Sequence, residues 1–490
     1  MVVPDKESAY RALQSHDARF DGQIFVGVKS TGIYCRPVCP ARTPKFENCM
    51  FYTSAAAAQE AGYRPCLRCR PETAPQLASW RGTSNTVSRA LTLIQDGALD
   101  GETHTVGALA KRLGMGERQL RRLFLQHIGV SPVAVAQTRR VLFAKQLIHD
   151  TDLPMTEVAL ASGFSSLRRF NEVFENLFQR PPGALRRKVS VAETSAGTVL
   201  RLRYRPPYDW DAMLRFLEAR AIPGVEVVTN RTYRRVIELD GAFGVVAVKH
   251  LPKRQSLSVT IQFPTVKALP GIVNRVRRQF DLNVDICTID EHLSRDPQLA
   301  SFVARRPGLR APGGWDGFEL AVRAVLGQQV SVSAARCLAG RLVERHGAAL
   351  PFSTSSYPGL THAFPSAKRL AKASSFGLGM PAARLETLRS VTCAAAKKPE
   401  VFQTANSMDE AVVSLKAIPG IGDWTAQYIA LRALREVDAF PSSDVGLLRG
   451  AKKVTGDVLT ARELLARAET WRPWRGYAAQ HLWAADGDSE

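Results

Sequence analysis

Hydrophobic and polar residues follow different periods in different parts of the chain, and the changes of period suggest its divisions. From Val87 to Phe178 apolar residues recur every three or four positions, which predicts amphipathic helices. Alternation with a period of two then predicts strands, and from about Glu291 to Glu490 the pattern is mostly helical again. The predicted strands cover 199–204, 233–239, 244–248 and 256–263, and a helix over 210–219 interrupts them.

Two segments rich in small and polar residues, Thr73–Thr83 and Ser190–Thr198, are predicted linkers. Residues 1 to about 77 are rich in loops and have no obvious core, so a bound metal would supply folding energy there. We therefore predict a multidomain α+β protein of four domains, with boundaries at 1–77, 85–189, 198–290 and 291–490.

The helical segment contains an imperfect repeat. Leu109–Met115 leads into Arg121–Phe124, and Val158–Phe164 leads into Phe170–Phe174, with a glycine at each turn. A short helix, a turn and a second helix form a helix-turn-helix, here in two copies. The alternative is a helical bundle that does not touch DNA. The second helices favour DNA binding because they carry a set of arginines: Arg118, Arg121, Arg122, Arg168 and Arg169.

The net charge of the chain also favours DNA binding. The 490 residues carry a formal net charge of +21, which favours polyanionic partners such as double-stranded DNA. Membrane attraction is the other explanation, but no apolar run approaches the roughly 20 residues of a spanning helix. The first residues lack the apolar centre of a signal peptide, and the remaining cysteines are scattered. We expect a cytoplasmic, nucleoid-associated monomer with no membrane partner.

Four of the eight cysteines form two close pairs, Cys35/Cys39 and Cys66/Cys69, which is the spacing of a tetrahedral zinc site. A purely structural zinc site is one explanation. The surrounding arginines favour a site that works against phosphate: Arg36, Arg42, Arg64, Arg68 and Arg70. A coordinated thiol is deprotonated and is therefore a nucleophile. Cys49 is a further thiol to which the sequence assigns no role.

The motifs TGIYCRPVCPARTPKFEN (31–48) and AGYRPCLRCRPE (61–72) closely resemble the zinc domain of the Ada methylphosphotriester regulators. The repeat over 85–188 resembles the AraC/XylS helix-turn-helix domain that follows the zinc domain in Ada. The first resemblance implies that one Zn²⁺ is bound by Cys35, Cys39, Cys66 and Cys69. It also implies that Cys35 accepts a methyl group from the DNA backbone and thereby switches on transcription, with RNA polymerase as a partner. Gly116 and Gln179 depart from the repeat's usual serine cap and glycine.

The second half lacks the Pro-Cys-His-Arg motif with which Ada proteins commonly end. It contains a helix-hairpin-helix motif at 415–426, followed by an aspartate segment at 438–447. With the stretches 205–226, 306–332 and 471–483, these motifs resemble the AlkA-type 3-methyladenine DNA glycosylases. That resemblance implies a mixed α/β domain followed by an all-helical glycosylase domain.

The same resemblance assigns residues. Asp444 would be the catalytic carboxylate, and the base pocket would be lined by Trp424, Tyr428 and Trp483. DNA would be contacted by Gly420, Gly422, Gln328 and Gln329, where Gln329 replaces a leucine wedge. Strand-cutting relatives carry a lysine at position 424, so tryptophan there implies a monofunctional enzyme. A monovalent cation is implied at the carbonyls of Lys416, Ile418 and Ile421.

The resulting hypothesis is a bifunctional alkylation-response protein that senses methylated phosphate and excises alkylated purines. One alternative is a zinc-dependent transcription activator with a non-catalytic glycosylase fold. In another, the front half merely targets the enzyme to DNA.

Overall fold

The structure is a computed structural model that describes residues 5–74, 85–100, 104–186, 197–351, 357–402 and 407–487. The predicted linkers lie largely outside these ranges. The chain divides into two compact units. Unit 1 contains 1–205, 251–274 and 282–285, and unit 2 contains 206–250, 275–281 and 286–490.

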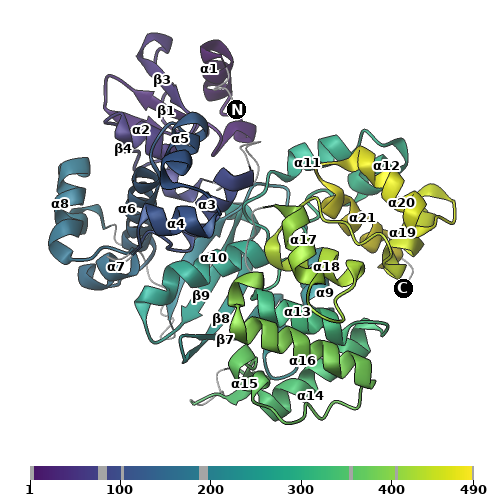
Figure 1. Cartoon of the computed structure of the whole chain (residues 1–490). Coiled ribbons are helices and arrows are strands. Elements are labelled where there is room, and N and C mark those ends of the chain that lie inside the picture. Colours follow the sequence, from purple (N-terminus) through teal and green to yellow (C-terminus); the bar gives the residue numbers. More distant parts are fainter. Residues whose placement is uncertain are drawn as a thin grey trace. The chain divides into compact units, whose positions relative to one another are not determined.

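Unit 1 begins with a small sheet whose strand order is β3-β1-β2-β4. The helix α2 lies against this sheet (Figure 1). Strands β2 and β4 are parallel, with Tyr34 opposite Pro65, so the chain brings Cys35 beside Cys66. The segment consists of α1 (Lys6–Gln14), β1 (Phe25–Val28), β2 (Ile33–Cys35), β3 (Cys49–Tyr52), α2 (Ala55–Glu60) and β4 (Arg64–Pro65). These strands are too short to show a period in the sequence.

The predicted helical repeat is confirmed. Helices α4 and α5 form one helix-turn-helix and α7 and α8 the other, with the long α6 between them. Gly116 caps α5 without a side-chain bond, and Gln179 takes the left-handed conformation that ends α8, with φ of 53°. The helices are α3 (Asn85–Gln95), α4 (Val106–Arg112), α5 (Glu117–Ile128), α6 (Pro132–Asp150), α7 (Met155–Ala161) and α8 (Leu167–Phe178).

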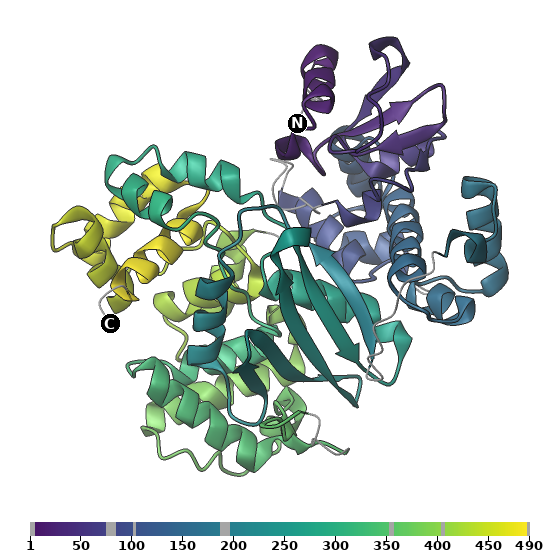
Figure 2. The same ribbon diagram turned by 180° about the vertical axis from the view of Figure 1, so that it is seen from behind.

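The predicted strands are present, and each unit holds its own set. In unit 1, β5 (Thr198–Arg203) pairs antiparallel with β9 (Ser256–Gln262). In unit 2, β6 (Glu226–Thr229), β7 (Thr232–Leu239) and β8 (Ala242–Leu251) form an antiparallel meander whose two long strands are seen side by side in Figure 2. The alternating pattern predicted all of these except the short β6. The predicted helix is α9 (Trp210–Arg220).

Helices form most of the rest of unit 2. They are α11 (Ile286–Leu293), α12 (Pro297–Arg305), α13 (Gly317–Leu326), α14 (Val332–His346), α15 (Ala367–Ala371), α16 (Ala382–Lys397), α17 (Met408–Lys416), α18 (Asp423–Ile429), α19 (Val445–Thr455), α20 (Ala461–Ala468) and α21 (Arg475–Gly487). Two-residue strands β10 (Ala348–Ala349) and β11 (His362–Ala363) pair, and α10 (Leu269–Gln279) crosses the division between the units. None of the helices in the described ranges combines the length and apolar character needed to span a membrane.

The helix-hairpin-helix consists of α17 and α18. Its turn needs glycine at 420, where φ is +84° and a Cβ would lie 1.9 Å from the Thr387 hydroxyl oxygen. Helix α18 continues directly into a π-helical turn, Ala430–Leu434.

Close packing of α19 against α21 depends on Gly450, where a Cβ would lie 2.0 Å from the Leu482 carbonyl oxygen. We predict that Gly450→Ala forces the helices apart and lowers the free energy of unfolding by about 1–3 kcal/mol. Urea unfolding followed by tryptophan fluorescence reports on unit 2. Gly487→Ala is the control, because Gly487 lies at the end of α21 in the same unit and a Cβ there meets open space. Equal stability of the two variants would contradict the packing argument.

Candidate functional site

The four paired cysteines come together in unit 1, and their sulfur atoms all lie within 4.8 Å of one another. Four thiolates at about 2.3 Å from a zinc ion would be about 3.8 Å apart, so the cluster fits a tetrahedral zinc site. Cys35 is half-buried, whereas Cys39, Cys66 and Cys69 are buried. Cys35 is therefore the ligand of the four that a large reactant can best approach.

Backbone and side-chain donors fix the cysteine loops. The Arg36 amide lies 3.4 Å from the Cys69 sulfur, and the Arg68 amide lies 3.3 Å from the Cys66 sulfur. The buried Arg36 guanidinium binds Asp21 and donates to the Cys69 carbonyl at 3.0 Å.

Two of the five flanking arginines are therefore occupied inside the structure and do not form part of a basic surface around the cysteines. Arg36 is buried in the pair with Asp21, and Arg70 is paired with Glu72 and Asp150. Arg42 and Arg68 are exposed and remain available to DNA.

A buried ionic network joins the cysteine segment to the central helix of the repeat. Lys145 on α6 donates to the Cys66 carbonyl and to Glu72, both at 2.8 Å. Arg70 bridges Glu72 at 2.9 Å and Asp150 at 3.1 Å. Burial alone would raise the pKa of Glu72, but Lys145, His149 and Arg70 hold that pKa well below its usual range. The network therefore holds the loop that carries Cys66 and Cys69 against α6. Separating the two would leave buried charges unpaired, which is energetically costly.

Cys49 lies outside the cluster, in the core beside Leu13 and Val26. Burial raises the pKa of its thiol, and its sulfur lies 3.3 Å from the Lys45 carbonyl oxygen. The structure thus gives this unassigned cysteine a packing role.

The repeat presents its arginines on exposed surfaces of α5 and α8: Arg118, Arg121, Arg122, Arg168 and Arg169. Arg121 pairs with Glu117, and Arg168 pairs with Glu172 within the same helix. Such exposed pairs contribute little to stability, so their arginines can exchange partners for phosphate.

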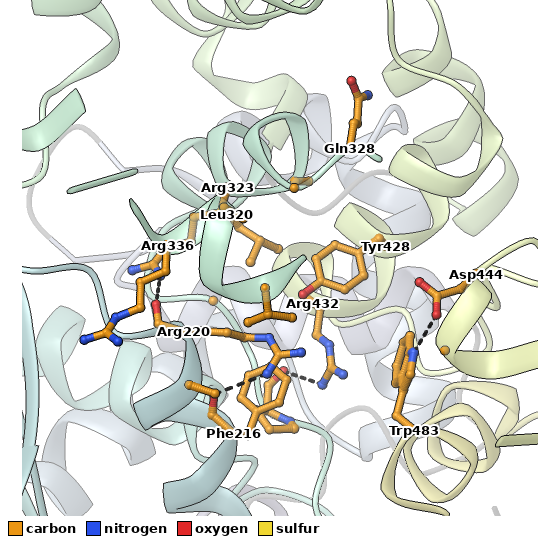
Figure 3. Close-up of a pocket in the computed structure, with 18 of the residues that line it drawn as sticks. Phe216, Arg220, Leu320, Arg323, Gln328, Arg336, Tyr428, Arg432, Asp444 and Trp483 are labelled. Atoms are coloured by element: carbon orange, nitrogen blue, oxygen red, sulfur yellow. Dashed lines mark hydrogen bonds between the residues drawn. The ribbon is translucent and has the colours of Figure 1, made fainter. Parts of the chain in front are cut away.

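In unit 2, Asp444 is the N-cap of α19 and receives three hydrogen bonds. The indole nitrogens of Trp424 and Trp483 donate at 2.7 and 2.9 Å, and the Leu447 amide donates at 3.0 Å. Figure 3 shows the bond from Trp483 to the carboxylate. These donors hold the carboxylate in place, half-buried at the edge of a cavity of about 1850 Å³.

The three predicted pocket aromatics also come together. Trp424 and Tyr428 are stacked with ring centroids 5.4 Å apart, and Tyr428 meets Trp483 edge to face at 6.4 Å. A base stacked between two rings needs them about 7 Å apart, which is twice the carbon–carbon contact distance of about 3.5 Å. In this conformation a base therefore has no room between Trp424 and Tyr428 and must use another face of the cluster.

The predicted DNA-contacting loops are joined to each other. Gln328 donates to the Thr425 hydroxyl at 3.0 Å and lies 3.4 Å from the Gly420 carbonyl oxygen, which links its loop to the hairpin. Gln329 is exposed in the left-handed conformation, with φ of 56°. Gly422 caps α18 with open space around it.

Two arginines and a phenylalanine of the pocket carried no recognisable signal in the sequence. Phe216 and Arg220 come from α9, and Arg432 comes from the π-helical turn after α18. Their segments resemble ordinary amphipathic helices, so periodicity alone could not identify them.

Comparisons with known proteins agree with this arrangement. Family models match the metal-binding domain of Ada over 8–72, a helix-turn-helix domain over 109–188 and the AlkA N-terminal domain over 199–316. The probable bifunctional transcriptional activator/DNA repair enzyme AlkA of Mycobacterium tuberculosis (strain CDC 1551 / Oshkosh) is 42% identical over 98% of this chain and 96% of its own length.

This chain belongs to that bifunctional AlkA family. DNA-3-methyladenine glycosylase 2 of Escherichia coli (strain K12) is 35% identical and covers 58% of this chain and 97% of its own length. The bifunctional activator/repair enzyme Ada of the same organism is 32% identical over 32% of this chain and 42% of its own length. A 3-methyladenine DNA-glycosylase structure from Archaeoglobus fulgidus, with a TM-score of 0.51 and 22% identity, covers 59% of this chain and 98% of its own length and shares its fold.

Membership of the bifunctional AlkA family confirms the multidomain α+β prediction and the three domain types. The matched ranges do not test the four predicted domain boundaries, which stay predictions.

The ionic network in unit 1 can be tested through Lys145, whose side chain is fully buried. Replacing it by methionine leaves Glu72 short of a cation, and breaking a buried ion pair costs about 3 kcal/mol or more. Lys145→Met should therefore reduce hydrogen-exchange protection in peptides covering α6 and 61–74, as measured by mass spectrometry. Lys111→Met, at an exposed position on α4, is the control. Unchanged protection in Lys145→Met would show that the network does not hold the segment.

Proposed function

We propose that this chain is a bifunctional alkylation-response protein. Residues 198–490 form a DNA-3-methyladenine glycosylase II, and residues 1–189 form a methylphosphotriester sensor that activates transcription. The observation that carries the enzymatic half is Asp444, a carboxylate held by two indole N–H groups at the mouth of an aromatic pocket.

In the proposed reaction the C1′–N bond of an alkylated purine breaks and its electron pair passes to the base. Positive charge then develops on the deoxyribose, where the Asp444 carboxylate stabilises it. Water adds to C1′ and loses a proton, for which Asp444 is the candidate base. The indole donors hold the carboxylate in one orientation throughout.

The tryptophan at position 424 limits the proposed reaction to hydrolysis of the glycosidic bond. An indole cannot form a Schiff base with the sugar, so the enzyme hydrolyses the glycosidic bond and leaves the strand intact. Alkylated purines such as 3-methyladenine and 7-methylguanine are good leaving groups, and their flat cationic rings suit the aromatic cluster. Gly420 and Gly422 would approach the DNA backbone, while Gln328 and Gln329 would fill the gap left by the flipped nucleotide.

In the proposed sensor reaction, Cys35, Cys39, Cys66 and Cys69 hold the zinc ion, which would keep their sulfurs in the thiolate form. The Cys35 sulfur attacks the methyl carbon of a methylphosphotriester. An S–C bond forms, the C–O bond breaks, and the electron pair restores the phosphate anion. The thioether is not regenerated, so each chain reacts once.

Methylation provides a switch through charge. It removes one negative charge from the cysteine cluster, which lowers its repulsion of DNA phosphates. Tighter binding of the repeat to promoter DNA follows, with Arg118, Arg121, Arg122, Arg168 and Arg169 as contacts and RNA polymerase as the downstream partner. We propose that the monomer acts at the nucleoid, and that the hairpin carbonyls of Lys416, Ile418 and Ile421 hold a monovalent cation.

The glycosylase proposal predicts that Asp444→Asn lowers base release by about a hundredfold to a thousandfold, because the neutral amide cannot balance the sugar cation. Release of 3-methyladenine from methylated duplex DNA is the measurement. Asp423→Asn removes an exposed carboxylate from the same hairpin and should stay close to wild type. Base release by Asp444→Asn equal to that of the wild type would refute the catalytic role of Asp444. A wild-type protein that activates promoters but releases no base would instead favour the zinc-dependent activator with a non-catalytic glycosylase fold.

The sensor proposal predicts one added methyl group on Cys35 after incubation with methylphosphotriester DNA, detected by peptide mass spectrometry. Cys35→Ser should gain none, since the hydroxyl is not a comparable nucleophile. Cys49→Ser should still be methylated, because Cys49 lies outside the cluster. Methylation of Cys39, Cys66 or Cys69 instead, or of no cysteine, would refute the role of Cys35.

A further inference from the structure

A buried guanidinium lies at the floor of the base pocket. Arg432 is 2% exposed and extends from the π-helical turn that follows α18. It donates to the Pro312 carbonyl at 3.0 Å and to the Gln480 amide oxygen at 2.8 Å. Figure 3 shows its side chain between Phe216 and Trp483, below Tyr428.

The charge of Arg432 is not neutralised locally. Among the described residues no carboxylate lies within ion-pair distance of it, and its Nε–H is buried without a hydrogen-bond partner. Burial lowers the pKa of Arg432. Tyr428 and the more distant Asp281 oppose this effect, and Arg220 and Arg435 add to it. The resulting pKa is about 10, so the group remains protonated at neutral pH. A buried unpaired cation costs several kcal/mol, and a neutral side chain could make both observed hydrogen bonds. The retained charge therefore indicates a function.

The aromatic rings of the pocket surround this charge. The Arg432 guanidinium carbon lies 4.8 Å from the Phe216 ring centroid, 4.9 Å from that of Trp483 and 5.9 Å from that of Tyr428. Arg220 contacts the same Phe216 ring at 4.1 Å. A ring whose π-face already binds one cation attracts a second cation less well.

The opposite charge lies on the other side of Trp483. Its indole contacts Arg432 and donates its N–H to Asp444 at 2.9 Å. The pocket is therefore positive at the Arg432 end and negative at the Asp444 end. This direction matters because glycosidic cleavage moves positive charge from the base to the sugar.

We propose that Arg432 is a positioning residue that sets the electrostatic gradient of the base pocket. This inference rests on the proposed glycosylase function. The guanidinium raises the energy of a bound cationic purine and favours movement of the glycosidic electron pair onto the base. The C1′–N bond breaks, the base leaves neutral, and the positive charge passes to the sugar beside Asp444. Arg432 thus weakens substrate binding and accelerates bond cleavage.

The proposal has a kinetic signature that a structural role would not give. Loss of the charge should lower the single-turnover rate constant and also lower the half-saturating DNA concentration. Each change should be about tenfold, as expected for one unit charge acting across a ring in a partly screened site. A merely structural role would lower the rate without tightening binding.

The test uses the full-length protein and a duplex with a single 7-methylguanine. Arg432→Gln should show both decreases, whereas Arg432→Lys, which keeps the charge, should stay near wild type. Arg220→Gln removes a neighbouring, less buried charge and should shift both quantities the same way by a smaller factor, which keeps the test valid if Arg432→Gln does not fold. Arg277→Gln is the control, because Arg277 is equally buried, has a pKa of about 10 lowered by burial, and does not line the pocket.

Weaker or unchanged DNA binding in Arg432→Gln and Arg220→Gln, or equal effects of Arg432→Gln and Arg432→Lys, would overturn the proposal. Failure of the proposed function itself is distinct, since the wild-type protein would then release no base.

Discussion

The geometry of the pocket in unit 2 depends on holding one carboxylate in a fixed position. Asp444 is bonded by donors from three segments, namely Trp424 on α18, Trp483 on α21 and the first turn of α19. These donors meet only if α19 and α21 pack backbone to backbone, which the absence of a side chain at Gly450 permits. The hairpin, the aromatic cluster and the final helix α21 thus together fix the position of the Asp444 carboxylate.

In unit 1, buried ion pairs fix the position of the cysteine loop. The charged groups Glu72, Lys145 and Arg70 are paired inside the structure, where they hold the cysteine loop against α6. Cys35 alone of the four clustered cysteines is half-buried. Within one cluster, the three buried cysteines are therefore placed to hold the metal, and the more accessible Cys35 is placed to react. This arrangement suits a sensor that reacts once, whereas a carboxylate that is not consumed suits an enzyme that turns over.

Much of this could be predicted from the sequence. The double helix-turn-helix, the long strands and α9 followed from periodicity, and the cysteine cluster and Asp444 followed from motifs whose spacing is specific. Contacts between distant segments could not be predicted. Flanking position suggested that Arg36 and Arg70 face phosphate, but Asp21 and Asp150 draw them inward. The closed stack of Trp424 on Tyr428 and the buried charge of Arg432 depend on side-chain packing, which no periodic pattern reports.

The central claim is that one chain combines a sensor that is consumed with an enzyme that is not. The most direct test incubates the protein with excess duplex DNA containing both methylphosphotriesters and 7-methylguanine. Methyl groups on the protein and free bases in solution are counted over time in the same samples. We predict that protein methylation stops at one group per chain while base release continues far beyond one per chain. Base release that stops with methylation, or methylation that exceeds one group per chain, would contradict this account.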